Sequence, residues 1–314
     1  MSIPVLDLHN YISGSKEERI QFVRDLGLAF EQVGFVGIVN HGLSEIWIDR
    51  LYDVVKKYFG LPLAQKKNHE VAGLAGQRGY TSFGREHAKG SEAHDLKEFF
   101  QFGQITGEHF PSNEEYPENV RVKEVPEFNE TLEKIFKLFE ISGSHLLRAI
   151  SEYLSLPTDY FDGSIERGNS ILRAIHYPPI TEEPKNSIRA EQHEDINLIT
   201  LLIGASADGL EILNKKGEWL PVTATKGQIV INVGDMLQRL TNNKLRSTTH
   251  RVVNPPRDLW HTSRFSIPFF LHPKGETSLA CLDSCITENV PKAYEDITAG
   301  EYLNERLREI GLKK

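Results

Sequence analysis

The stretch HEDINLITLL, residues 193–202, decides the fold of this chain. Its polar opening leads into an apolar run with β-branched residues, and such a run is typical of a strand in a sheet core. Alternate residues of a strand share a face, so the sequence predicts that His193 and Asp195 point to one side and Glu194 to the other.

Short β-like runs recur on both sides of this stretch and are separated by turns rich in Gly, Asn and Pro. Many short strands at regular spacing predict an antiparallel barrel or a jelly roll, also called a double-stranded β-helix. The predicted strands are Ile171–Tyr177, Ile196–Ile203, Leu210–Leu213, Trp219–Val222, Gln228–Asn232, Met236–Leu240, Ser247–Val253 and Arg264–Leu271.

The flanking regions favour helices. Apolar residues recur at helical spacing over residues 16–33, 44–60, 126–154 and about 299–311, and Gly34 is expected to end the first of these helices in a left-handed conformation. Strands are predicted at residues 3–8 and 35–39. We therefore expect a mainly β protein with flanking α. Residues 165–280 would form the core, residues 1–164 would pack on it, and residues 281–314 would form a helical segment over the active site.

Composition excludes several classes of protein. The 314 residues carry a formal net charge of −8 and show no Lys/Arg-rich run, which argues against nucleic acid as a partner. The N-terminus lacks the pattern of a signal peptide, and no apolar run is long enough to cross a membrane. With two cysteines a disulfide framework is not expected, so we predict a cytoplasmic protein and turn to its 12 histidines.

Three side chains form a candidate metal site. His250 follows Asp195 by 55 positions and is expected to reach the same point as His193 and Asp195 from another strand of a closed sheet. Two imidazoles and one carboxylate on one side of a metal are typical of non-heme Fe(II) oxygenases, and they leave coordination positions open for a co-substrate and O₂. By itself the His-x-Asp tripeptide is more often a chance match with a hydrogen-bonded histidine.

A second group of residues strengthens the hypothesis. Arg264 and Ser266 alternate on a predicted strand, so their side chains share a face. A guanidinium beside a hydroxyl suits a carboxylate, which arginine binds through two charge-assisted hydrogen bonds. The alternative is a surface arginine on an edge strand, but the apolar run over residues 265–270 disfavours it.

These motifs resemble one known family in order and spacing. Residues 193–202, 209–213, 234–235, 250–254 and 264–270, with 3–8, 34–42 and 79–80 upstream, look like the iron/2-oxoglutarate-dependent dioxygenases related to isopenicillin N synthase. The resemblance covers nearly the whole chain. It implies a jelly-roll core and oxidation of a small organic molecule by hydroxylation, desaturation or ring closure, with release of succinate and CO₂.

The resemblance also implies the site residues. His193, Asp195 and His250 would bind Fe(II), Arg264 and Ser266 would hold the distal carboxylate of 2-oxoglutarate, and Tyr177 would add a hydroxyl donor. No catalytic residue is expected beyond the metal site. The expected cofactors are Fe(II), 2-oxoglutarate as co-substrate, and O₂, with ascorbate as an optional reductant. The expected partner is a small-molecule substrate, and the expected state is a monomer or a weak homo-oligomer.

Several alternatives stay open on the sequence. Many plant members have asparagine where Ile175 stands, so the resemblance leaves open the contact that this asparagine makes with the co-substrate. Arg264 and Ser266 establish a carboxylate site but leave open which carboxylate fills it. An oxidase similar to isopenicillin N synthase, without 2-oxoglutarate, is one alternative, and a metal-binding protein without catalysis is another. A zinc hydrolase is disfavoured because Arg264 and Ser266 would then lack a purpose.

Substrate selection is expected from the parts that cover the core, chiefly residues 72–107 and the C-terminal helix. Four cationic residues are candidate anchors for an anionic substrate, although solvated surface charge is the commoner reading for each. These are Arg78, Arg85, Lys97 and Arg189. His176 is expected to be a hydrogen-bonded histidine that points away from Tyr177.

Overall fold

The protein is built on two β-sheets that face each other. The computed structural model describes residues 3–74, 76–85, 94–113, 115–184, 187–204, 208–223, 225 and 227–309. The larger sheet has the order β1-β2-β10-β7-β12-β5-β4-β3, and the smaller has the order β6-β11-β8-β9. In the larger sheet the strands are β1 (Val5–Asp7), β2 (Phe35–Val39), β3 (Gly79–Thr81), β4 (Glu98–Gly103), β5 (Ile171–Tyr177), β7 (Ile199–Ile203), β10 (Ile229–Val233) and β12 (Arg264–Leu271). In the smaller they are β6 (Ala190–His193), β8 (Leu210–Leu213), β9 (Trp219–Pro221) and β11 (His250–Val252).

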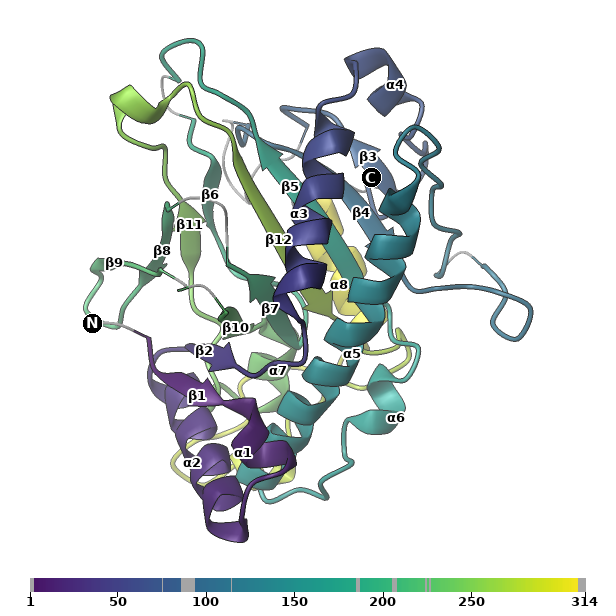
Figure 1. Cartoon of the computed structure of the whole chain (residues 1–314). Coiled ribbons are helices and arrows are strands. Elements are labelled where there is room, and N and C mark those ends of the chain that lie inside the picture. The colour runs from purple at the N-terminus through teal and green to yellow at the C-terminus, as the bar shows by residue number, and fades with distance from the viewer. Residues whose placement is uncertain are drawn as a thin grey trace.

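Apolar side chains from both sheets meet between them. Phe99, Ile175 and Tyr177 of the larger sheet form one buried cluster with Ala190 and Val252 of the smaller sheet. In Figure 1 the smaller sheet lies on the left, the larger sheet in the middle and the long helix α5 (Glu127–Tyr153) on the right. This arrangement confirms the predicted mainly β jelly-roll core with flanking helices, although neither sheet closes into a barrel.

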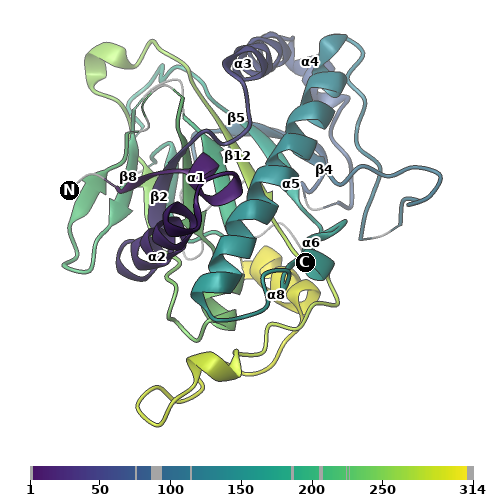
Figure 2. The same cartoon turned by 60° about the horizontal axis from the view of Figure 1, so that its bottom comes forward.

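Alternate residues of β12 point to opposite faces of the larger sheet, so one set packs against the helices and the other lines the space between the sheets. On its outer face Phe269 packs against Phe136 and Phe139 of α5, with ring centroids 5.1 and 5.2 Å apart. The alternate residues Arg264, Ser266 and Pro268 point between the sheets. Helix α5 runs diagonally across the front of the molecule in Figure 2. The other helices are α1 (Leu8–Ile12), α2 (Lys16–Gln32), α3 (Glu45–Phe59), α4 (Leu63–Lys67), α6 (Asp162–Ile165), α7 (Asp235–Leu240) and α8 (Ala299–Glu309).

Local signals set the ends of α2. Ser15 and Glu18 form a reciprocal capping box at its start. At its end Gly34 has a φ of +77°, as the sequence predicts, and a Cβ there would lie 2.4 Å from the Thr248 hydroxyl. The tight turn leads directly into β2, whose Phe35 packs edge-on against the His250 ring at 5.6 Å.

Some predicted elements differ from the structure, and one extends beyond the described residues. The run Met236–Leu240 is a helix, α7, rather than a strand, because residues 236, 237 and 240 bury one helical face and Asp235 stands in the first turn. The predicted strand at residues 3–8 is split, since Asp7 accepts a hydrogen bond from the His9 amide and starts α1. Helix α8 is described to residue 309, and the last two predicted positions, 310–311, lie outside the described residues.

Strands from the first 103 residues complete the larger sheet at both edges, because β2 pairs with β10 and carries β1, and β4 pairs with β5 and carries β3. Within the described ranges, every helix is too short or too polar to cross a lipid bilayer.

Candidate metal centre

Two histidines lie directly opposite each other in the smaller sheet. The register of the antiparallel strands β6 and β11 pairs His193 with His250, and their ring centroids are 4.4 Å apart. Strand β6 ends at His193, so the prediction that Asp195 shares this strand is wrong. Asp195 lies in the following loop, which turns back toward the two rings. One ligand atom from each of His193, Asp195 and His250 lies within 4.8 Å of the others.

Hydrogen bonds to backbone carbonyls fix the orientation of both imidazoles. His193 Nδ1 lies 2.6 Å from the Glu191 carbonyl oxygen, and His250 Nδ1 lies 3.1 Å from that of Thr248. A carbonyl oxygen only accepts, so each Nδ1 carries the proton and each Nε2 keeps its lone pair. His250 Nε2 is 3.8 Å from Asp195 Oδ1, which leaves room for a metal ion between them.

Asp195 is held by two buried donors on neighbouring strands. Its Oδ2 accepts hydrogen bonds from the Thr200 hydroxyl of β7 at 2.5 Å and from the Asn232 amide of β10 at 2.7 Å. Asn197 in turn donates to the Thr200 oxygen at 2.9 Å. With Oδ2 occupied in this way, Oδ1 is the oxygen that faces His250.

The loop around Asp195 is also fixed through its backbone. The Asp235 amide donates to the Asp195 carbonyl at 2.7 Å, at the start of α7. This close approach requires glycine at position 234, where a Cβ would lie 2.2 Å from the Asn197 carbonyl oxygen. Helix α7, predicted as a strand from the sequence, therefore has a structural purpose, because it holds the loop that carries a ligand.

The charge states suit a divalent metal. Burial, with the neighbouring His250, lowers the pKa of His193 to about 4, so its imidazole is neutral at pH 7. Burial opposes ionisation of Asp195, but the two imidazoles and the Asn232 and Thr200 donors hold its pKa below its usual value. Two neutral nitrogens and one carboxylate oxygen on one side of a site fit Fe(II). Within the described ranges this is the one group of three or more His, Cys, Asp and Glu side chains with such spacing.

A narrow cavity of about 70 Å³ lies between the triad and the larger sheet. Arg264, Ser266 and Tyr177 line it from β12 and β5, and His193, Asp195 and His250 also border it. The structure therefore brings all six predicted site residues around one cavity. Arg264 is 1% exposed, its Nε donates to the Asp208 carbonyl at 3.2 Å, and its guanidinium carbon lies 5.1 Å from the centre of the Tyr177 ring. A cation buried at this depth suits an anionic ligand in the cavity.

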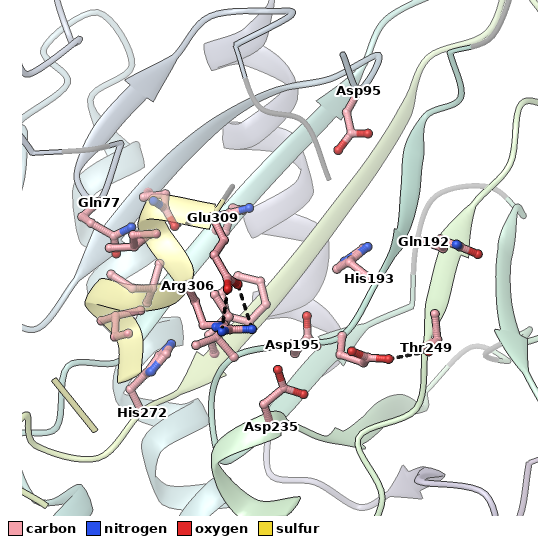
Figure 3. Close-up of a pocket in the computed structure, with 18 of the residues that line it drawn as sticks. Gln77, Asp95, Gln192, His193, Asp195, Asp235, Thr249, His272, Arg306 and Glu309 are labelled. Atoms are coloured by element: carbon pink, nitrogen blue, oxygen red, sulfur yellow. Dashed lines mark hydrogen bonds and ion pairs between the residues drawn. The ribbon is translucent and has the colours of Figure 1, made fainter. Parts of the chain in front are cut away.

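A larger cavity of about 460 Å³ opens on the other side of His193 and Asp195 (Figure 3). Its walls include Leu303, Arg306 and Leu307 of α8, together with Asp235 and His272. Lys97, Arg173 and Phe270 border both cavities. The volume falls within the roughly 300–1,000 Å³ typical of small-molecule sites.

A buried ion pair outside the triad orients His193 through the backbone. Lys97 Nζ lies 2.7 Å from Asp95 Oδ2, and Asp95 Oδ1 accepts the Glu191 amide at 2.9 Å. The carbonyl of the same Glu191 residue accepts the His193 Nδ1 proton. Asp95 is therefore a positioning residue, since it holds the peptide that holds a ligand ring.

We expect Asp95→Asn to weaken binding of a divalent metal by about 10-fold. This is the lower end of the loss that is usual when a residue hydrogen-bonded to a metal ligand is substituted. The amide still accepts the Glu191 proton but no longer balances the buried Lys97 ammonium. Anaerobic calorimetric titration with Fe(II) or Mn(II) measures the change. The matched control is Glu211→Gln, which breaks the Arg251–Glu211 ion pair of the same sheet outside both cavities. Equal metal affinity of Asp95→Asn and the wild type would contradict the positioning role.

The other cationic candidates have different surroundings. Arg78 donates to the Pro117 and Gln77 carbonyls beside a separate cavity, and Arg85 pairs with Glu70 at the surface. Arg189 is 1% exposed and lies 5.9 Å from the Tyr177 ring. Of these four candidates, Lys97 is the one that borders the two cavities of the site.

His176 is a hydrogen-bonded histidine, as predicted. It contacts Glu98 at 2.8 Å and Ser263 at 3.0 Å on the outer side of the sheet.

Three residues that hold the site, Thr200, Asn232 and Asp95, are absent from the sequence-based predictions. A signal exists for the first two, because each is a polar residue inside a run of apolar strand residues and is buried in the structure. Asp95 carries no comparable signal, since its partner Glu191 lies 96 positions away in the chain.

Two family models match the chain. The model described as the N-terminal region of a non-haem dioxygenase in morphine synthesis matches residues 3–124. The model of the 2OG-Fe(II) oxygenase superfamily matches residues 168–273, the part that carries the triad and Arg264.

Curated relatives align with the chain over nearly its full length. The proline hydroxylase buaE of Petromyces alliaceus is 32% identical over 98% of this chain and 99% of its own. The 2-oxoglutarate-dependent dioxygenase ecdK of Aspergillus rugulosus is 32% identical over 96% and 97% of the two chains.

Solved structures share the fold. A 2OG-Fe(II) oxygenase family protein from Caulobacter crescentus is 41% identical with a TM-score of 0.88, and the alignment covers 98% of this chain and 99% of that one. A Neurospora crassa protein, crystallised in complex with alpha-KG and thymine, is 27% identical with a TM-score of 0.86, over 98% of this chain and 96% of that one.

Proposed function

This chain belongs to the 2OG-Fe(II) oxygenases of the isopenicillin N synthase-like superfamily and oxidises a small molecule with Fe(II) and 2-oxoglutarate, and from this premise we propose the role of each site residue. His193, Asp195 and His250 hold Fe(II). Arg264 and Ser266 bind the distal carboxylate of 2-oxoglutarate, and Tyr177 contributes its hydroxyl. The observation that carries the proposal is the close approach of three ligand atoms beside a narrow cavity whose far wall holds a buried arginine.

Each cavity has its own ligand in this proposal. The narrow cavity between the sheets takes 2-oxoglutarate, with the distal carboxylate against Arg264 and the other end toward the triad. The larger cavity takes the substrate, and Leu303 and Leu307 of α8 exclude water from one side of it. Residues 165–280 thus act as the catalytic core, and residues 1–164 and 281–314 cover it.

Formal charges support this assignment. A divalent metal and the Arg264 guanidinium offset the dianion of 2-oxoglutarate and the Asp195 carboxylate, so the formal charges of these four groups sum to zero. A neutral sum matters here because an unbalanced charge in a buried site costs several kcal/mol. His193 and His250 contribute no charge as neutral ligands.

When bound at this site, Fe(II) and 2-oxoglutarate supply the activation of O₂, with oxidative decarboxylation of 2-oxoglutarate to succinate and CO₂. The part played by the protein is geometric. The three ligands leave the side toward the cavities open, and the Glu191 and Thr248 carbonyls keep both imidazoles in the tautomer that binds metal. The substrate is held in the larger cavity beside His193 and Asp195, where hydroxylation, desaturation or ring closure takes place.

We also propose that the protein acts in the cytoplasm as a monomer or a weak homo-oligomer, without nucleic acid. The net charge of −8 supports the absence of a nucleic-acid partner, since a basic surface is the usual requirement. Light scattering after size exclusion tests the oligomeric state, and a tight dimer at micromolar concentration would contradict it.

The function is tested by titrating the anaerobic Fe(II) protein with 2-oxoglutarate and then admitting O₂. We expect a metal-to-ligand charge-transfer absorption on titration and succinate release with O₂. The matched control is succinate semialdehyde, which lacks the 2-oxo acid group that chelates the metal. No spectral change and no succinate would overturn the proposal, and O₂ consumption that does not need 2-oxoglutarate would favour the oxidase alternative.

A further inference from the structure

A second arginine lies buried beside the narrow cavity. Arg189 directly precedes β6, and the next residue, Ala190, lines that cavity. The guanidinium carbon of Arg189 lies 5.9 Å from the centre of the Tyr177 ring, and that of Arg264 lies 5.1 Å from the centre of the same ring. Arg189 is not one of the residues that line the cavity, so any effect on a bound molecule passes through its charge or through its neighbours.

The Arg189 side chain is held through one of its nitrogens. Its Nη2 donates to the carbonyl of Thr262 at 3.1 Å, two positions before Arg264 in the chain. Its Nε is enclosed by protein and has no hydrogen-bond partner, and no carboxylate among the described residues forms an ion pair with the guanidinium. The residue is 1% exposed, so water does not take the place of an anion. A buried cation in such surroundings is unfavourable until an anion lies near it.

The positive charge of Arg264 adds to this cost. Burial, and after it the charge of Arg264, lower the pKa of Arg189 to about 10. The guanidinium keeps its proton at pH 7, but the lowered pKa means that its surroundings disfavour the charged form. Because the two guanidiniums repel each other, an anion that binds at one of them also stabilises the other.

Backbone hydrogen bonds fix the segment that carries Arg189. The carbonyl of Ile188 accepts the Leu96 amide at 3.1 Å, and the Glu191 amide donates to the Asp95 carboxylate at 2.9 Å. The chain is therefore tied to one neighbouring segment on both sides of Arg189. This anchoring fixes the point from which the arginine side chain reaches the Tyr177 ring.

The charge of Arg189 stands outside the formal sum of the metal, 2-oxoglutarate, Arg264 and Asp195. Resting on the proposed function, we infer that Arg189 is a positioning residue for the co-substrate and that it selects 2-oxo acids whose distal group is anionic. Its charge attracts the distal carboxylate that lies against Arg264. The cavity then discriminates against a 2-oxo acid with an uncharged distal end more strongly than Arg264 alone would allow.

The test measures the dissociation constants of 2-oxoglutarate and 2-oxobutyrate by anaerobic charge-transfer titration of the Fe(II) protein. 2-Oxobutyrate keeps the group that chelates the metal but lacks the distal carboxylate. We expect Arg189→Gln to raise the dissociation constant of 2-oxoglutarate by about 10-fold, as for the loss of one charge–charge attraction in a buried site. The constant of 2-oxobutyrate should stay close to that of the wild type.

Two further variants separate the charge of Arg189 from a structural role. Arg189→Lys keeps the positive charge without the shape of a guanidinium, so it should retain most of the preference for 2-oxoglutarate over 2-oxobutyrate. Arg78→Gln is the matched control, because Arg78 is also 1% exposed and donates to backbone carbonyls but lies beside a different cavity. It should leave both dissociation constants unchanged.

The outcomes separate this inference from the proposed function. If Arg189→Gln binds 2-oxoglutarate as tightly as the wild type, the inference is overturned while the proposed function stands. Equal weakening of both 2-oxo acids overturns it as well, because that result indicates an arginine that only supports the fold. If Arg189→Gln does not fold, Arg189→Lys decides, and loss of its preference for 2-oxoglutarate overturns the inference. Failure of the wild-type protein to bind 2-oxoglutarate overturns the proposed function and the inference together.

Discussion

Asp195→Asn is expected to remove Fe(II) binding and to lower succinate formation from 2-oxoglutarate by more than about 100-fold, beyond the 10–100-fold typical of outer partners of a metal site. The amide keeps an oxygen that accepts the Thr200 and Asn232 hydrogen bonds, so the loop is expected to keep its shape. The substitution replaces the anionic Oδ1 that faces His250 with an amide NH₂ group. This group donates hydrogen bonds and offers no lone pair to a metal cation. Anaerobic Fe(II) titration and a succinate assay measure the two losses.

The matched control for this variant is its neighbour in the chain. Glu194→Gln removes a carboxylate that accepts the Thr249 hydroxyl and lies outside the three-ligand group, so its metal affinity should stay close to that of the wild type. Retained Fe(II) binding by Asp195→Asn would overturn the assignment of the carboxylate ligand. Loss of metal without any change in turnover would favour the alternative of a metal-binding protein without catalysis.

Arg264→Gln is expected to raise the dissociation constant of 2-oxoglutarate by about 100-fold. Two charge-assisted hydrogen bonds of about 1.5 kcal/mol each sum to about 3 kcal/mol, and each factor of ten in affinity corresponds to about 1.4 kcal/mol. Arginine at this position is 1% exposed and borders the narrow cavity, so water does not replace the lost bonds readily. The anaerobic charge-transfer titration gives the constant directly.

Companion measurements show whether the arginine acts on the distal carboxylate. Arg264→Lys should fall between the wild type and Arg264→Gln, because an ammonium keeps the charge but loses the bidentate geometry. A 2-oxo acid without the distal carboxylate, such as 2-oxobutyrate, should bind the wild type and Arg264→Gln with similar affinity. If Arg264→Gln weakens the binding of 2-oxobutyrate as strongly as that of 2-oxoglutarate, the arginine does not act through the distal carboxylate.

Much of the fold follows from local patterns in the chain. The alternation of apolar residues over residues 171–177 and 264–271 predicts β5 and β12 with their observed ends. The 3.6-residue spacing over residues 126–154 predicts α5 within one residue at each end. The predicted strand at Met236–Leu240 is wrong because apolar residues 236, 237 and 240 fit one face of a helix, although a run of five residues is too short to establish a period by itself. The contacts that decide in favour of a helix come from Asp195 and Asn197, about 40 positions earlier in the chain.

The predicted site residues follow from residue type and order in the chain. His193, Asp195, His250, Arg264 and Ser266 could be named from the sequence because their spacing is tied to strand alternation and to the resemblance to a family. The residues that orient them could not be named in this way. Thr200, Asn232 and Asp95 act through hydrogen bonds to Asp195 or Glu191, which come from other segments of the chain, and neither period nor composition encodes such pairs.

The sequence by itself determined the chemical class of the site, because the identities and spacing of two histidines, one aspartate and one arginine restrict the chemistry that they support. Only the tertiary structure decided how the site divides into two cavities and which charges face the larger one. Arg173 and Arg306 are 133 positions apart, and the folding of α8 over the sheets brings both to the same cavity. A long-range arrangement of this kind depends on the packing of whole elements, which local sequence patterns do not specify.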